Sequence, residues 1–299
     1  MDLDLVRTEY LQYSKHFKSS AAFSYDRSHL NTIIDFMIDN QITNSEDLDY
    51  NSIYDFIDNS KIRNNTNNTI NKRIALLKRA ISFQVKQEKC KPSIIATFPK
   101  LKVIDKRFNI VHEDTMKRVI DYLLGKDDSF INCRNRVIFF IFVDTGARLS
   151  EVANIKLKNI DFRTNSILLE HTKAKRERVV YFSNFTQKHL LLYLDLIDDS
   201  NAYLLRNSRN NQPMNYRGVM RVLDRVRDDL KLEHLSSHMI RHSYGTLAYK
   251  KQISEFFTNH SMGHARMDMT RRYTHYDIET NKKIYDQLAP MEHYTKKSK

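Results

Sequence analysis

Apolar residues recur at helical spacing through the first hundred residues. In one stretch Leu30, Ile33, Ile34 and Met37 fall at positions i, i+3, i+4 and i+7, the pattern of a helix with one buried face. The same kind of spacing predicts about four helices, over residues 3–18, 24–40, 48–58 and 70–81. We therefore expect a small helical bundle, followed by a linker between Pro92 and Pro99.

The pattern changes in the second part of the chain, where short apolar runs alternate with helical spacing. The runs at 166–170 and 177–182 predict two strands, joined by the polar segment 171–176 as a hairpin tip. Helices are predicted over 112–124, 131–144, 184–197, 215–230, 236–250 and 277–288. With only five glycines and four prolines in the chain, the expected fold class is mainly α with a small β-sheet.

Composition excludes several classes of protein. The longest apolar run, residues 137–143, is too short for a membrane helix and suits a buried segment. The acidic start Met1-Asp2-Leu3-Asp4 does not resemble a signal peptide. The two cysteines, Cys90 and Cys133, favour a reducing compartment and are too few for a cysteine-rich zinc site. We therefore expect a cytoplasmic protein.

The net charge is the most informative number. Lys and Arg total 49 against 36 Asp and Glu, so the net charge is +13, which favours a nucleic-acid partner over a membrane surface. Residues 35–58 carry seven acids and no Lys or Arg, whereas residues 61–91 carry nine bases and one acid. This asymmetry predicts a phosphate-binding face, and a solvated basic face is the alternative. The bases that we assign to DNA binding are Lys72, Arg73, Lys78 and Arg79.

Three segments carry residues suited to chemistry on a phosphate. Arg148 lies where one apolar helical pattern ends at a glycine and another begins. His238 and Arg241 stand one turn apart near a predicted helix start, after two serines that can cap it. His264 follows Met262-Gly263, and Tyr273 lies nine residues later. Taken alone, each feature can be explained as a surface charge or as a residue that packs in the core.

A zinc site is the rival interpretation of the histidines. His238 and His242 are i, i+4, and so are His260 and His264. No glutamate stands in a His-Glu-x-x-His arrangement, and no cysteine or nearby carboxylate completes a ligand set. This interpretation is the weaker one.

Taken together, the motifs resemble the tyrosine recombinases of the phage integrase family, and among them the Xer-like members. The residues that carry the resemblance are Arg148 in TGARLSE, Lys173 in TKAKRER, His238 and Arg241 in HMIRHSYGT, His264 in MGH and Tyr273 in RRYTHY. The resemblance implies a helical core-binding domain over 1–100 and a mixed α/β catalytic domain with a C-terminal tail over 101–299. It also implies a C-shaped clamp around double-stranded DNA, with four protomers acting on two core sites.

The residue types fit that chemistry. Transesterification builds negative charge on the nonbridging phosphate oxygens, which Arg148 and Arg241 can neutralise and to which His264 can donate. Tyr273 is the expected nucleophile, with Tyr276 as the backup, and forms a 3′-phosphotyrosyl bond that allows religation without ATP. Because the arginines neutralise the charge, we expect no metal and no cofactor.

Three further roles complete the expected site. His238 is the candidate to take the tyrosine proton. Lys173 is the candidate to protonate the leaving 5′-hydroxyl, and Lys175 is its competitor on the same side of the strand. Glu151 is expected to orient a cationic partner rather than to react.

Some alternatives stay open. A type IB topoisomerase or a telomere resolvase would use the same residues, and a non-catalytic DNA-binding regulator would share the charge. The tail 277–299, with Ile278, Ile284 and Leu288, is expected to pack on a neighbouring protomer, and packing on its own domain is the alternative.

Overall fold

The structure is a computed structural model. It describes residues 1–91, 98–103, 109–170, 177–198, 201–263 and 278–295. The chain divides into two compact units, Met1–Lys106 and Arg107–Lys299, which we describe separately. The predicted boundary at residue 100 lies a few residues before this division, and the roles assigned to the two parts stay predictions.

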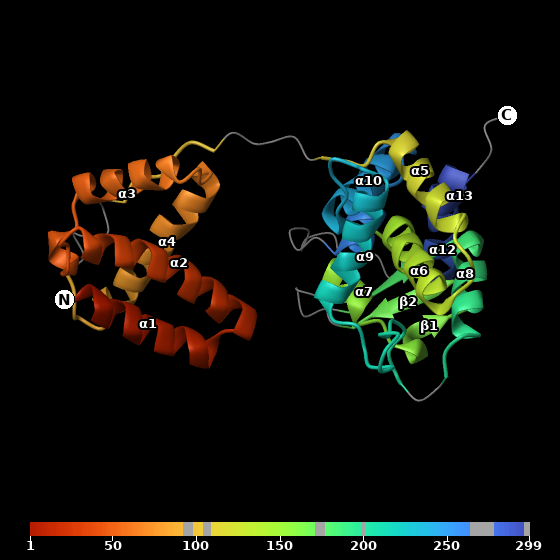
Figure 1. Cartoon of the computed structure of the whole chain (residues 1–299), viewed down its shortest axis with the longest axis horizontal. Helices are drawn as coiled ribbons and strands as arrows, with labels where there is room; N and C mark the ends of the chain where they lie inside the picture. The colour runs from red at the N-terminus through yellow and green to blue at the C-terminus, as the bar shows by residue number, and fades with distance from the viewer. Residues whose placement is uncertain (92–97, 104–108, 171–176, 199–200, 264–277, 296–299) are drawn as a thin grey trace. The chain divides into compact units, whose positions relative to one another are not determined.

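The first unit is helical (Figure 1). Its helices are α1 (Leu3–Phe17), α2 (Ser20–Asp39), the short 3₁₀ helix η1 (Ser45–Asp47), α3 (Tyr50–Ile62) and α4 (Asn67–Val85). Asp2, Ser19, Asp49 and Thr66 each precede an α-helix, and each side chain accepts a backbone N–H of the first turn. The apolar stripes meet in one core, which includes Leu30, Ile33, Ile34 and Met37 at full burial.

The second unit is built around one helix that is buried on nearly every side (Figure 1). Its helices are α5 (Glu113–Leu124), α6 (Phe130–Thr145), α7 (Leu149–Ala153), η3 (Leu157–Asn159), α8 (Asn184–Leu194), α9 (Tyr216–Asp229), α10 (Ser237–Lys250), α11 (Glu255–Met262), α12 (Ile278–Leu288) and α13 (Pro290–Thr295). α6 contains the apolar run 137–143, all of it buried, and packs against α5, α8, α9, α10 and α13. None of the described helices is long and apolar enough to cross a membrane.

A three-stranded antiparallel sheet completes the second unit. Its strands are β1 (Ile160–Asp161), β2 (Ser166–Leu169) and β3 (Arg178–Tyr181), in the order β1-β2-β3. Ile167 pairs with Val180, and both are buried. The two longer strands are the predicted hairpin, and its tip, 171–176, lies outside the described residues. The mainly α fold class with a small sheet is therefore confirmed.

The C-terminal helices correct one expectation. Leu288, Met291 and Tyr294 are buried in the core of their own unit, and Ile284 packs against it, so the described part of the tail folds back on its own domain. A buried carboxylate fixes this packing, because Asp144 accepts from the Met291 N–H at 2.9 Å. The sequence alone could not distinguish a partner from the chain's own core, since either would bury the same residues.

Candidate active site

Arg148 is placed by a glycine turn between α6 and α7. Gly146 ends α6 with a left-handed φ of +57°, and a Cβ added there would lie 3.0 Å from the Tyr244 ring. Glycine is therefore required both by the backbone conformation and by the close approach of α10. The turn leaves Arg148 as the N-cap of α7, with its side chain partly exposed.

Glu151 is the fixed point to which two arginines attach. Its carboxylate accepts from the Arg148 N–H at 2.7 Å and from Arg148 Nη1 at 3.0 Å. Arg178, at the start of β3, adds two parallel bonds of 2.8 Å each. Burial alone would raise the pKa of Glu151, but the bonds and charge of Arg178 and Arg148 outweigh it and lower that pKa. The carboxylate is therefore ionised and holds both guanidinium groups.

Three guanidinium groups converge on three consecutive carbonyls at the end of α11. Arg178 Nε donates to Ser261 O at 2.8 Å, Arg241 Nη2 donates to Met262 O, and Arg148 Nη2 donates to Gly263 O at 2.8 Å. The C-terminal carbonyls of a helix lack intrahelical donors and carry partial negative charge. Gly263 has a φ of +67°, and a Cβ there would lie 3.1 Å from the Arg178 guanidinium. A larger residue at 263 would therefore separate the arginines from this helix end.

α10 supplies His238 and Arg241. The Ser236 side chain caps the helix by accepting from the Met239 N–H at 3.3 Å, so His238 falls in the first turn and is exposed. Arg241, one turn further on, is buried and donates from Nη1 to Gly146 O at 2.7 Å. Burial, followed by the charges of Arg148 and Arg178, lowers the pKa of Arg241 to about 10. The side chain stays protonated at neutral pH and carries its charge into a space shared with Arg148.

Several predicted site residues lie outside the described residues: Lys173, Lys175, His264, Tyr273 and Tyr276. Gly263 directly precedes His264, and β3 follows the segment that carries Lys173. The structure therefore brings together Arg148, Glu151 and Arg241 and leaves the other assignments as predictions.

Arg178 is the site residue that sequence reasoning missed. It is one of 49 basic residues, and its partner Glu151 lies 27 positions away in the chain. Its place near the start of the predicted strand 177–182 gave no sign of a role in the site. Its pairing with Glu151 is a tertiary contact, which the local sequence does not reveal.

The described residues do not support the zinc interpretation. Among them, no three His, Cys, Asp or Glu side chains gather in a way that could hold a metal ion. His238 and His242 are both on α10, and burial followed by the charges of His238 and Arg241 lowers the pKa of His242. The second pair is only half described, since His264 lies outside the described residues.

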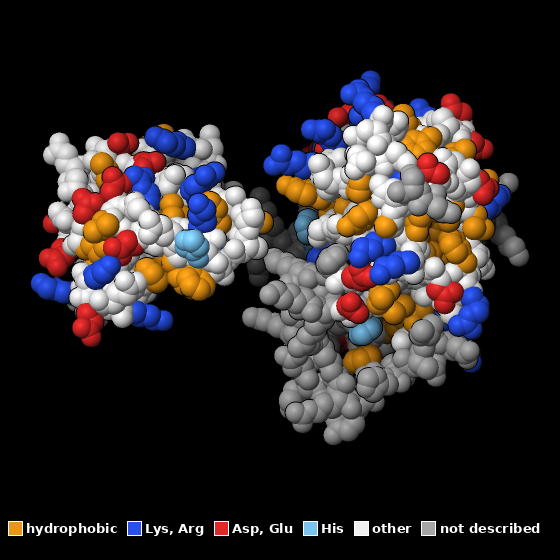
Figure 2. All heavy atoms as spheres, turned by 90° about the horizontal axis from the view of Figure 1, so that it is seen from below, with side chains coloured by type: hydrophobic (Ala, Val, Ile, Leu, Met, Phe, Trp, Pro, Cys, Tyr) orange, Lys and Arg blue, Asp and Glu red, His pale blue; other side chains and the backbone are white. Residues whose placement is uncertain are grey.

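The basic residues assigned to DNA binding lie on α4. Lys72 and Arg79 are exposed and stand two turns apart on the face opposite the core, and Arg73 and Lys78 flank that face. In the part of the chain that the structure describes, Arg73 Nε is buried without a hydrogen-bond partner. Burial, followed by the charges of Arg73 and Lys72, lowers the pKa of His29 on α2. The face therefore carries a positive field, although acids and bases of this unit both reach the surface seen in Figure 2.

The comparison with protein-family models decides the family. Residues 109–280 match the model described as the phage integrase family, which is more than half of the chain. The chain belongs to the phage integrase family. The match includes Arg148, Glu151, Arg178 and Arg241, which lie together at the candidate site. It also includes His238, which lies on α10 with Arg241.

Relatives of this integrase extend the match over nearly the whole chain. Tyrosine recombinase XerC of Bacillus pumilus is 24% identical over 290 residues, covering 93% of this chain and 92% of the relative. Among solved structures, a lambda integrase dimer bound to a COC′ core site gives a TM-score of 0.72 at 16% identity, covering 91% of this chain and 77% of that chain. The Tn1549 transposon integrase in complex with circular intermediate DNA gives 0.73 at 14% identity, covering 94% and 97%.

These matches confirm the expected family, the Xer-like resemblance and the enzyme class, a tyrosine recombinase. The fold agrees over both units, since the solved integrases cover more than nine-tenths of this chain. The relatives named here are recombinases and integrases, and none is a topoisomerase, a telomere resolvase or a non-catalytic regulator.

Proposed function

We propose that this integrase is a site-specific recombinase that cuts and rejoins duplex DNA through a 3′-phosphotyrosyl intermediate, in integration, excision or resolution. The observation that carries the proposal is the convergence of Arg148 and Arg241 on neighbouring carbonyls, Gly263 O and Met262 O. Both guanidinium groups are fixed by backbone oxygens, and both stand at the residues that directly precede His264. Fixed cations of this kind stabilise charge that develops on a phosphate without reorganising during the reaction.

In the proposed reaction Tyr273 attacks the scissile phosphorus and displaces the 5′-hydroxyl oxygen. Attack requires a base that removes the phenol proton, because the ordinary pKa of a tyrosine is about 10. Its proton passes to His238, which is exposed in the first turn of α10. Lys173 gives a proton to the leaving oxygen, with Lys175 as its competitor, and His264 donates to a nonbridging oxygen. Religation runs these steps in reverse with a 5′-hydroxyl of the partner strand.

Glu151 and Arg178 act as positioning residues in this scheme. Neither needs to touch the phosphate, since Glu151 is fully enclosed and Arg178 is bound to it twice. Their role is to hold Arg148 against Gly263 before DNA arrives. This arrangement lowers the entropy that the arginines lose when the phosphate binds.

The proposed partner is double-stranded DNA carrying specific core sites. The net charge of +13 and the α4 face support the polyanion partner. Exchange between two duplexes requires two sites and hence, with two cleavages at each, four protomers. The two cysteines are both free, which supports a reducing compartment, and we place the protein in the cytoplasm.

The test is to trap and map the covalent intermediate. Sequencing of DNA ends covalently bound to the protein in cells would give the site, from which a nicked substrate that cannot religate is made. The wild type should then accumulate a protein–DNA adduct on a peptide containing Tyr273, and Tyr273→Phe should bind the same DNA and form none. Tyr276→Phe is the matched control and should still form the adduct.

Two outcomes would overturn parts of the proposal. An adduct on Tyr276 would move the nucleophile three residues along the chain. Relaxation of a supercoiled plasmid that proceeds equally well with one site, two sites or none would replace recombination by topoisomerase activity.

A further inference from the structure

One buried tyrosine touches both segments that hold the arginines of the candidate active site. Tyr244 lies on α10, one turn beyond Arg241, and is only 2% exposed. Its ring packs against the turn between α6 and α7, since a Cβ added at Gly146 would lie 3.0 Å from that ring. Its hydroxyl lies 3.0 Å from the hydroxyl of Ser261, near the end of α11. Tyr244 therefore joins the turn that leads to Arg148 with the helix end that receives the guanidinium groups.

Arg241 joins the same two segments from the preceding turn of α10. It donates from Nη1 to Gly146 O at 2.7 Å and from Nη2 to Met262 O. Arg241 and Tyr244 are three positions apart, so they lie on one face of the helix. In the proposed reaction Arg241 also binds the phosphate, whereas Tyr244 is enclosed by protein. The enclosed side chain can therefore hold the two segments together without taking part in the reaction itself.

Ser261 uses both of its oxygens in this arrangement. Its hydroxyl bonds to Tyr244, and its carbonyl oxygen accepts from Arg178 Nε at 2.8 Å. That carbonyl is the first of the three at residues 261–263 that accept from arginines, which we call the carbonyl shelf. A shift of Ser261 would displace the shelf and, through Arg178 and the carboxylate to which it is bound, would reach Arg148.

The bond between the two hydroxyls is strongly favoured because both groups are buried. Burial raises the pKa of the Tyr244 phenol, so the hydroxyl keeps its proton at neutral pH and remains a hydrogen-bond donor. A buried hydroxyl without a partner loses the hydrogen bonds that water gives it in the unfolded chain. Each hydroxyl is therefore held by the other, and the bond fixes the end of α11 against α10.

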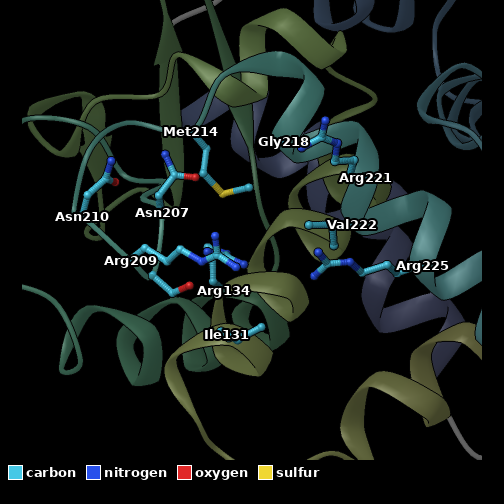
Figure 3. A pocket seen from close by; sticks show the side chains of 11 residues that line it. Ile131, Arg134, Asn207, Arg209, Asn210, Met214, Gly218, Arg221, Val222 and Arg225 are labelled. Carbon is cyan, nitrogen blue, oxygen red and sulfur yellow. The ribbon is translucent and has the colours of Figure 1, made fainter.

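Another buried arginine of this unit shows that burial alone does not fix a guanidinium group (Figure 3). Arg134 is 5% exposed, and its Nε has no hydrogen-bond partner in the described structure. It lines a basic pocket of about 650 Å³ together with three arginines from the loop 207–210 and from α9, which are Arg209, Arg221 and Arg225. At the candidate active site, in contrast, each of the three guanidinium groups donates both to the carbonyl shelf and to the segment 146–151. The placement of these arginines therefore depends on how the shelf lies against that segment.

We propose that Tyr244 and Ser261 are positioning residues for DNA cleavage, whose hydrogen bond sets the carbonyl shelf against the α6–α7 turn and so places Arg148 and Arg241 on the scissile phosphate. The inference rests on the proposed function, because it assigns these two arginines to the phosphate. Tyr244 and Ser261 are both buried and do not touch DNA themselves. Loss of their bond should therefore slow the chemical step and leave DNA affinity unchanged.

The first experiment measures single-turnover formation of the covalent adduct on the nicked substrate, with DNA affinity measured in parallel. Tyr244→Phe keeps the ring against Gly146 and removes only the hydroxyl. It should slow adduct formation at saturating protein by about 10- to 100-fold, as expected when catalytic groups are misplaced by a fraction of an ångström to about 1 Å. Ser261→Ala removes the other half of the bond and should show the same defect, and both variants should bind DNA with wild-type affinity.

The double variant shows whether the two residues act as one unit. Each single change already removes the whole bond, so Tyr244→Phe combined with Ser261→Ala should be no slower than the slower single variant. Defects that multiply would mean that the two residues act independently. A wild-type rate in either single variant would mean that the bond positions nothing. Either result would overturn the proposal.

Tyr193→Phe is the matched control. Tyr193 is fully buried on α8, and its hydroxyl donates to Leu204 O at 3.1 Å. Tyr193→Phe should lower the melting temperature, as Tyr244→Phe does, and should leave the rate unchanged at a temperature at which every variant is folded. An equal loss of rate in the two variants would mean that general stability, and not the position of the shelf, sets the rate.

A neutral substrate tests whether the bond acts through the arginines. In a methylphosphonate, a methyl group replaces one nonbridging oxygen of the scissile phosphate and removes the charge that the arginines bind. The ratio of the wild-type rate to the Tyr244→Phe rate should then fall toward one. A ratio as large as that on ordinary DNA would overturn the proposal, because Tyr244 would then act on something other than the arginines.

Tyr273→Phe separates this inference from the proposed function. If Tyr273→Phe forms the adduct normally, the proposed function fails. If it forms none and Tyr244→Phe reacts at the wild-type rate, the proposed function stands and only the role of Tyr244 and Ser261 is wrong.

Discussion

The arginines of the candidate active site and the bases of α4 carry the same charge in opposite settings. Arg148 and Arg178 are bound to the buried carboxylate of Glu151, and Arg148, Arg178 and Arg241 all donate to carbonyls at the end of α11. Of the α4 bases, Lys72 and Arg79 are exposed on the outward face and Arg73 and Lys78 flank it, and no ion pair of these four is seen among the described residues. The first set is fixed by the protein, and the second is free to adjust to its ligand.

The difference separates two uses of positive charge. Stabilising a transition state requires donors that are already in place, since reorganisation would cost part of the gain. Holding a polyanion requires only charge near phosphates, because the gain comes largely from released counterions. We therefore expect substitutions in the first set to change the rate of cleavage and those on α4 to change the salt dependence of binding.

The largest expected effect concerns Lys173 as general acid. Lys173→Ala should slow cleavage of ordinary DNA by roughly 10² to 10⁴, the range of general acid catalysis. Replacing the bridging 5′ oxygen with sulfur should restore nearly the wild-type rate, because a thiol leaves readily, with an ordinary pKa of about 8.5. Single-turnover cleavage of the two substrates measures this.

Lys175→Ala is the matched variant for that test and should show neither the defect nor the rescue. If sulfur rescues Lys175→Ala or His238→Ala instead, the proton donor is that residue. If it rescues none of them, Lys173 only holds the DNA.

The next largest effect is expected at the fixed arginines. Arg148→Ala should lower the single-turnover rate by about 10² to 10³, which is typical for the loss of one donor to developing charge. The slope of log K against log salt should flatten by no more than about 0.9, the contribution of one phosphate contact. Arg227→Ala, which removes a charge already paired on α9, is the control and should leave the rate unchanged. An equal loss of rate in both variants would mean that net charge, and not a fixed donor, sets the rate.

Glu151 should contribute stability that depends on pH. Glu151→Gln leaves Arg178 buried without its full counter-charge and should cost about 3 to 5 kcal/mol of unfolding free energy. The folded pKa of Glu151 lies below its usual 4.5, so the stabilisation is complete above about that pH and declines as the pH falls through the lower folded value. Denaturant unfolding of both proteins at several pH values should show their difference narrowing in acid.

Glu170→Gln is the control for this measurement. Glu170 pairs with Lys156 at 2.7 Å nearer the surface, so its loss should cost about 1 kcal/mol or less. A cost at Glu151 no larger than at Glu170, or a difference that does not narrow in acid, would contradict the role of Glu151 as the fixed point.

The smallest effect per residue is expected on α4. Replacing Lys72, Arg73, Lys78 and Arg79 together should flatten the salt slope by up to about 3 to 4, and each single change by about 0.9. Lys61→Ala on α3 is the control, because Lys61 already lies near Asp58 at 3.8 Å. An unchanged slope in the fourfold variant would place the DNA face of the first unit elsewhere.

The fold could be predicted from the sequence wherever periodicity was strong. The helix with Leu30, Ile33, Ile34 and Met37 and the strands around Ile167 and Val180 all formed, because each buries one continuous face. α11 and α13 were not predicted. They are eight and six residues long, with too few turns for a pattern to stand out.

The candidate site could be predicted only in part, for a different reason. Arg148 and the His238–Arg241 helix stand out locally, through a glycine turn and a serine cap. Arg178 does not, because its meaning comes from contacts with Glu151 and Ser261, which are distant in the chain. The basic pocket around Arg134 is equally invisible in the sequence, since its arginines come from three elements.

The division between fixed and free charge can be tested in one paired measurement. The single-turnover cleavage rate and the salt slope are measured on the same DNA for Arg148→Ala and for the fourfold α4 variant. We expect Arg148→Ala to lower the cleavage rate strongly and to leave most of the salt slope unchanged. We expect the fourfold α4 variant to flatten the salt slope and, at saturating protein, to cleave at the wild-type rate. If both variants lose rate and slope in the same proportion, the two sets of charges act alike and the account is wrong.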